Sequence, residues 1–140
     1  MMNTKIYKSV HGLAEKLMVA ANKDDREAFD LLYAELKAIC IDNENTEKDH
    51  PVQWETLADF TEELEDAVTG YVKALKKSTD INSKDYMSSI AFSMATLQIE
   101  LGHTDAAIKN LQDAKVSANK IEDEELKIEI DELLKTLVEG

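Results

Sequence analysis

The chain has 140 residues, of which 44% are hydrophobic and 32% charged, a balance typical of one globular domain, here residues 1–140. Its 16 basic and 29 acidic side chains give a formal charge of −13. Because a field of that sign repels nucleic-acid phosphates and anionic membrane surfaces, we expect neither as a ligand. The N-terminal residues lack the apolar segment of a secretory signal, and no stretch approaches the roughly 18 apolar residues of a membrane span. We therefore expect a soluble, cytoplasmic protein.

Apolar residues recur every three or four positions along most of the chain, which is the spacing of one face of an α-helix. One Pro and four Gly are few turn residues, so the composition also favours helix throughout. Two such segments cover residues 4–21 and 25–41. A short polar connection separates them, in which Asp24 or Asp25 can cap the second helix, and its brevity predicts an antiparallel hairpin over residues 4–41.

The polar stretch 42–51 is the clearest loop, and it ends in Pro51, which suits the first turn of a helix. The pattern of residues 51–78 permits either one unbroken helix or a second hairpin. We favour a break near residues 60–62, with Thr61 as the cap of the following helix.

A third hairpin is predicted over residues 83–119, with its first helix ending at Gly102, since glycine readily adopts the left-handed backbone of a helix end. Thr104 and Asp105 open its second helix. The last segment, residues 121–138, has one apolar and one charged face. Such a helix suits the end of a stacked array, where it caps the last hairpin.

Small residues recur in the second helices of two hairpins. Ala67-x3-Tyr71-x2-Ala74 is matched 40 residues later by Ala107-x3-Leu111-x2-Ala114. The physical reason is packing, because alanines let neighbouring helices approach closely and a large residue between them fills the gap.

This pattern resembles the tetratricopeptide repeat (TPR) family, in which a Gly closes the first helix and Ala, a large residue and Ala follow at fixed steps. The match is carried by Gly102, Ala107, Leu111 and Ala114, and it extends over residues 88–118. It is partial over residues 51–78, where Glu62 replaces the turn glycine, and faint over 4–41. The resemblance implies an all-α, right-handed array of about three antiparallel hairpins with a C-terminal capping helix.

The resemblance also implies a function, which is non-enzymatic binding of a protein or peptide segment on a concave surface lined by first helices. By position, that groove would contain Ser89, Phe92, Thr96, Ile99 and Glu100. Some TPR domains grip a C-terminal carboxylate with Lys, Asn and Arg at such positions, but this chain has none of them there. An apolar and acidic groove would instead prefer a basic or amphipathic peptide. Core packing accounts equally well for Phe92 and Ile99.

Acidic residues are concentrated between Glu55 and Asp66, next to Trp54, another candidate for the partner-binding surface. Glu62 and Glu63 lie in this run, which is either a solvated face or a docking surface for a basic partner. The docking interpretation predicts binding that weakens strongly with salt.

Catalytic and metal chemistry find little support in the sequence. Glu47 and His50, like Glu100 and His103, have the Glu-x-x-His spacing of di-iron bundles, but the first pair lies in a loop and the second straddles Gly102. Cys40, the only cysteine, lies in an apolar run and is expected to be a buried hydrophobe. We therefore expect no catalytic residue, no metal and no cofactor.

Two alternative functions are compatible with these patterns. One is a small chaperone of the kind that serves secretion systems, since such proteins also resemble short acidic TPR arrays. The other is a helical module that forms a homodimer by burying its apolar faces against a second copy.

Overall fold

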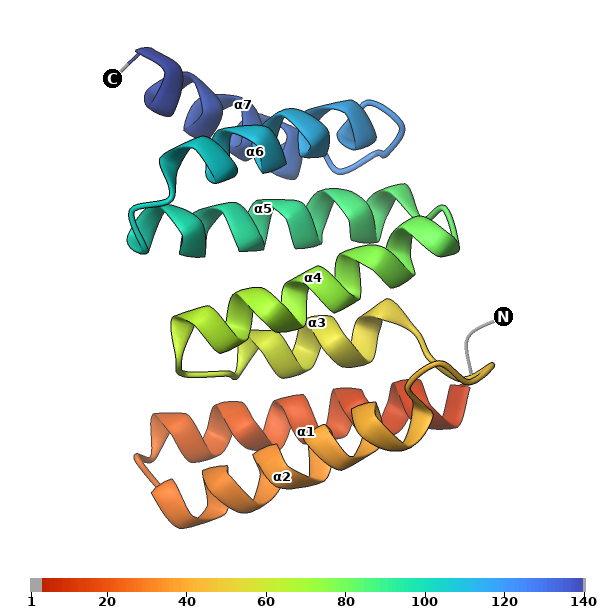
Figure 1. The fold of residues 1–140 in the computed structure, drawn as a ribbon. Helices are drawn as coiled ribbons and strands as arrows, with labels where there is room; N and C mark the ends of the chain where they lie inside the picture. Colours follow the sequence, from red (N-terminus) through yellow and green to blue (C-terminus); the bar gives the residue numbers. More distant parts are fainter. Residues whose placement is uncertain (1–3, 140) are drawn as a thin grey trace. The chain divides into compact units, whose positions relative to one another are not determined.

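The computed structural model describes residues 4–139, and every regular element within them is an α-helix, as the sequence predicts (Figure 1). The helices are α1 (Thr4–Asn22), α2 (Arg26–Asn43), α3 (Pro51–Asp59), α4 (Leu64–Asp80), α5 (Lys84–Glu100), α6 (Thr104–Ala118) and α7 (Glu124–Glu139). Among the described residues, no helix is both long and apolar enough to cross a membrane. The chain divides into two compact units, Met1–Gly70 and Tyr71–Gly140, with the boundary inside α4.

The first unit has its core between α1, α2 and α3. Side chains at helical spacing on α1 and α2 are buried as the pattern predicts, and α3 adds its own apolar residues. The buried apolar side chains of these helices are Val10, Leu13, Leu17, Ala20, Phe29, Leu36, Cys40, Trp54, Leu57 and Ala58. Cys40 is buried, as expected, and its Sγ donates a hydrogen bond to the backbone oxygen of Gln53 (3.2 Å).

Two helix starts in this unit are capped in different ways. The carboxylate of Asp25 accepts a hydrogen bond from the backbone N–H of Ala28 (3.2 Å), which confirms the predicted cap of α2. Pro51 is the first residue of α3, as predicted, and the preceding residue, His50, caps the helix. Its Nδ1 accepts from the backbone N–H of Val52 (3.1 Å).

Residues 51–78 contain two helices, because α3 ends at Asp59 and α4 begins at Leu64. The break confirms the prediction, but the predicted cap was wrong. The Thr61 hydroxyl donates to the backbone oxygen of Leu57 (2.7 Å), so it is used by the last turn of α3. The Glu63 carboxylate caps α4 instead, accepting from the backbone N–H groups of Glu65 (3.2 Å) and Asp66 (3.0 Å). A negative charge there also suits the positive end of the helix dipole.

Small residues let α3 and the start of α4 approach closely. A Cβ atom placed on Gly70 would lie 3.1 Å from the Cβ of Ala58, which is tighter than ordinary van der Waals contact. Glycine therefore fits at this position without displacing α3. The turn glycine expected before α4 by the TPR pattern is absent, and Gly70 lies further along the helix.

The second unit contains the rest of α4 with α5, α6 and α7, and its core is rich in alanine. The buried members of its main apolar cluster are Ala91, Ala95, Ala107, Leu111, Ala114, Ala118, Ile121 and Ile130. Gly102 ends α5 with a φ of 81°, the left-handed conformation that the sequence predicts. On α7, Ile130 is completely buried while the Asp123 carboxylate caps the helix by accepting from the backbone N–H of Leu126 (3.0 Å).

Candidate functional site

The sequence-predicted groove residues form one stripe along α5 in the second unit. Ser89, Phe92, Thr96 and Ile99 are half-buried and Glu100 is exposed. They occur at steps of three and four residues, so they share one face of the helix. The structure thus brings all five onto one face of α5.

The opposite side of α5 is buried by its neighbours. Ala91 and Ala95 belong to the apolar cluster, and Gln98 is anchored to α6, where its Oε1 accepts from Asn110 Nδ2 (2.6 Å). Phe92 and Ile99 also pack against the cluster with part of their surface. Each therefore has a packing role as well as an exposed part, so core packing and the groove interpretation are compatible at these two positions.

The stripe on α5 offers apolar surface and hydroxyl groups rather than charge. The Thr96 hydroxyl donates to the backbone oxygen of Ser93 (2.7 Å), which leaves its methyl group and both lone pairs of its oxygen for other contacts. Glu100 provides the only formal charge of the predicted set. Such a surface can bind an apolar side chain and one basic group.

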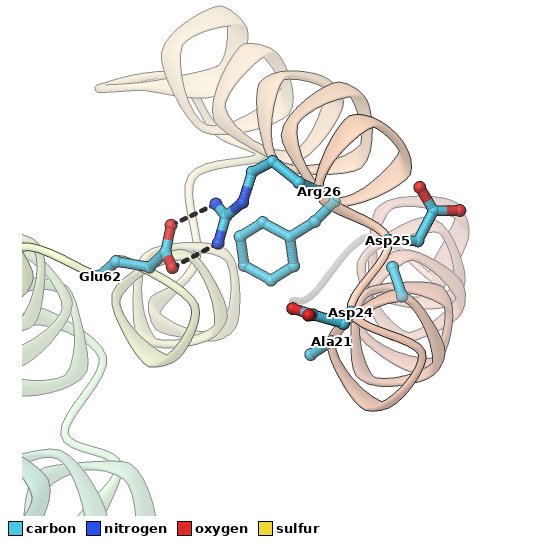
Figure 2. A pocket seen from close by; sticks show the side chains of 7 residues that line it. Ala21, Asp24, Asp25, Arg26 and Glu62 are labelled. Atoms are coloured by element: carbon cyan, nitrogen blue, oxygen red, sulfur yellow. Dashed lines mark hydrogen bonds and ion pairs between the residues drawn. The ribbon is translucent and has the colours of Figure 1, made fainter.

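Glu62, a predicted docking residue of the first unit, is paired with Arg26 (Figure 2). The two guanidinium nitrogens donate to both carboxylate oxygens at 2.6 and 2.8 Å, and Arg26 also contacts Asp30 (3.2 Å). This hydrogen bonding with Arg26 lowers the pKa of Glu62 and raises that of Arg26. Both side chains are largely exposed, so we expect the pair to contribute little to stability.

A pocket of about 210 Å³ lies beside this ion pair, with Phe29 and the turn between α1 and α2 on its other sides (Figure 2). The Arg26 guanidinium lies 5.1 Å from the centre of the Phe29 ring, a cation–π distance. Sequence reasoning missed Arg26, although a signal exists. It is the only arginine in the chain, and arginine is the base suited to a two-pronged bond with a carboxylate.

Glu63 and Trp54, the other predicted partner-binding residues of this unit, have interactions within the chain. Glu63 caps α4, as described above. Trp54 is only 5% exposed, and its Nε1 donates to the Asp49 carboxylate (2.8 Å), which ties α3 to the loop before it. A partner could therefore contact little of the Trp54 side chain. Glu65 and Asp66 are the exposed acids that remain at the start of α4.

The two Glu-x-x-His pairs do not come together with other ligands. His50 uses Nδ1 to cap α3, and His103 precedes α6 without a side-chain capping bond. Among the described residues, no group of three or more His, Cys, Asp and Glu side chains is placed to hold a metal ion.

His50 gives the first unit a predicted pH dependence. Burial lowers the pKa of His50, because the neutral ring is favoured in the folded chain. The charge of Asp49 has a smaller effect in the opposite direction. Below about pH 6.5 the unfolded chain binds a proton here that the folded chain resists, so stability is lost as the pH falls and is fully present above that value. We expect the urea midpoint to fall more between about pH 7.5 and 5.5 for the unmodified protein than for His50→Asn, whose amide can still cap α3. Equal decreases would exclude His50 as the titrating group.

Comparisons with known proteins add no relative. No protein-family model matches the sequence, and neither the curated proteins nor the solved structures include a match.

Proposed function

We propose that this chain is a non-enzymatic, TPR-like interaction domain of the cytoplasm that binds a segment of another protein along α5. The observation that carries the proposal is the half-exposed stripe formed by Ser89, Phe92, Thr96 and Ile99. One side of α5 is fixed by the alanine-rich core, so this stripe is held on a rigid element. Rigid presentation lowers the entropy cost of binding.

The hairpin formed by α5 and α6 supports the TPR-like part of the proposal. Gly102 has the left-handed conformation required where the first helix ends, and Ala95, Ala107 and Ala114 are completely buried. These are the positions at which the family pattern calls for glycine and small residues. The α7 helix contributes Ile130 to the same core, as a capping helix would.

The chemistry of the stripe suggests an amphipathic segment with a basic group. Phe92 and Ile99 offer exposed apolar surface on the same face as Thr96, and Glu100 adds a carboxylate at one end. The overall charge of −13 further favours approach of a basic partner.

Substitution of Thr96 by arginine tests this proposal. We expect Thr96→Arg to reduce recovery of partner proteins on the immobilised chain at least about tenfold, because a bulky cation enters the stripe and repels a basic segment. Thr136→Arg is the matched control. Thr136 is an exposed residue of α7 whose hydroxyl also donates to a backbone oxygen of the preceding turn, that of Glu132 (2.9 Å). Quantitative mass spectrometry of the retained proteins provides the measurement.

The result would contradict the proposal if both arginine variants retained the same proteins in equal amounts, or if the unmodified chain retained none. Sedimentation at micromolar concentration separates self-association from partner binding. A dimer that Thr96→Arg converts to monomer would mean that the stripe binds a second copy instead.

A further inference from the structure

A second surface lies on the other side of α5, away from the stripe. It is a cavity of about 310 Å³ lined by the last turns of α4, the first turns of α5 and the end of α6, all in the second unit. Leu75, Met87 and Ala91 provide its apolar lining, and Val116 forms one wall. The volume lies at the lower end of the roughly 300–1,000 Å³ that is typical of ligand sites.

Apolar surface continues out of this cavity toward solvent. Val116 is 69% exposed, and Val72, three residues before Leu75 on α4, is 53% exposed. Residues three apart on a helix are neighbours on its surface, so Val72 extends the apolar lining beyond Leu75. An open apolar depression with walls made of helices has the form of the grooves that accept an amphipathic helix.

Lysines lie in and near this groove, as do two exposed acids, Asp80 beside Thr79 and Asp85 beside Lys84. Lys84 lines the cavity directly, and Lys76 lies four residues after Val72 and three before the lining residue Thr79. On α6, Lys109 lies two turns before Val116, and Lys120 follows the end of that helix at Ala118. The only acid in the lining is Asp113, and its charge is already paired with Lys109 (3.2 Å).

We propose that this groove binds an acidic amphipathic helix of a partner protein. Apolar side chains of that helix would enter the cavity between α4 and α6, and its carboxylates would pair with Lys76, Lys84 and Lys120 at the edges. This partner helix is acidic, whereas the segment proposed to bind the stripe on α5 is basic. Charge complementarity of this kind selects the partner and speeds its association. The two proposals use opposite sides of α5 and can succeed or fail separately.

Two synthetic peptides of about 18 residues, or five helical turns, test the proposal. Both carry leucine at the spacing i, i+3, i+4 and i+7, which forms one apolar face of a helix. The positions that flank this face are glutamate in one peptide and lysine in the other. We expect the acidic peptide, labelled with fluorescein, to bind with saturation in fluorescence anisotropy at about 0.05 M salt, at least about tenfold more tightly than the basic peptide.

Variants of the chain identify the surface involved. The double substitution Lys76→Glu with Lys84→Glu should weaken binding of the acidic peptide at least about tenfold. The same charge change at two exposed lysines of α1, Lys8→Glu with Lys16→Glu, is the matched control and should alter it less than about threefold. Far-UV circular dichroism verifies that both double variants remain folded. Thr96→Arg should bind the acidic peptide normally, which separates this test from that of the stripe.

Three outcomes would overturn the proposal. The first is no saturable binding of the acidic peptide up to about 1 mM. The second is equal binding of the acidic and basic peptides, or equal loss of binding in the groove and control variants. The third is a dimer in sedimentation that the substitutions at Lys76 and Lys84 dissociate, since the occupant would then be a second copy of the chain.

Discussion

Replacing Leu111 with alanine is expected to lower the free energy of unfolding of the second unit by about 2–5 kcal/mol. Leu111 is completely buried and is one of the few large side chains in a cluster composed mainly of alanines. Ala107 and Ala114 flank it on α6, and alanine has no rotatable side chain that could fill the space. We therefore expect a cavity that closes incompletely and a loss in the upper part of that range. Urea unfolding followed by circular dichroism gives the measurement.

Val116→Ala is the matched control for this substitution, since Val116 lies on the same helix but is 69% exposed. We expect it to change the free energy of unfolding by less than about 0.5 kcal/mol. Amide hydrogen exchange should place the loss caused by Leu111→Ala in α5, α6 and α7. Similar losses of unfolding free energy for the two variants would mean that Leu111 does not lie on the buried face of α6.

The helices of this chain could be predicted because their signals are local. The spacing of Val10, Leu13 and Leu17 identifies the buried face of α1 without knowledge of its neighbours. The end of α5 at Gly102 depends on backbone conformation, which a single residue type indicates. For the start of α4 the sequence favours Thr61, because a hydroxyl is a good cap. In the structure the preceding turn uses that hydroxyl and Glu63 caps α4 instead, a competition that propensity alone does not resolve.

The candidate site was harder to predict because its decisive interactions connect distant residues. Glu62 and Arg26 are separated by 36 residues, so no helical spacing joins them. For the stripe on α5, the sequence indicates which residues share a face. Whether a half-buried Phe92 serves the core or a partner depends on the neighbouring helices. The lysine-edged groove was missed for a related reason, since its lining comes from three separate helices.

Trp54 illustrates a different limit of sequence reasoning. A tryptophan beside an acidic run is typical of a binding surface, yet α3 is a short helix that is buried over most of its circumference. Pro51, Gln53, Leu57 and Ala58 are all buried with it. Periodicity indicates one buried face and gives no sign that a nine-residue helix is covered on several sides. A hydrogen bond from Trp54 to Asp49 also connects the helix to the loop before it.

Trp54→Ala should consequently act on stability, with an expected loss of about 3–5 kcal/mol in the free energy of unfolding. Trp54→Phe retains most of the apolar volume but removes the N–H that donates to Asp49. A hydrogen bond to a charged group contributes roughly 1.5–3 kcal/mol, so we expect the phenylalanine variant to lose about that much. Because neither variant keeps the only tryptophan, urea unfolding is followed by far-UV circular dichroism rather than by fluorescence.

The same pair of variants separates the two roles considered for this residue. If Trp54 is structural, the phenylalanine variant remains folded at neutral pH and retains the same partners as the unmodified chain, since the stripe on α5 is unchanged. If Trp54 contacts a partner, Trp54→Phe loses that partner while the free energy of unfolding changes by less than about 0.5 kcal/mol. The second result would require α3 to expose Trp54 when a partner binds, and would return this residue to the binding surface.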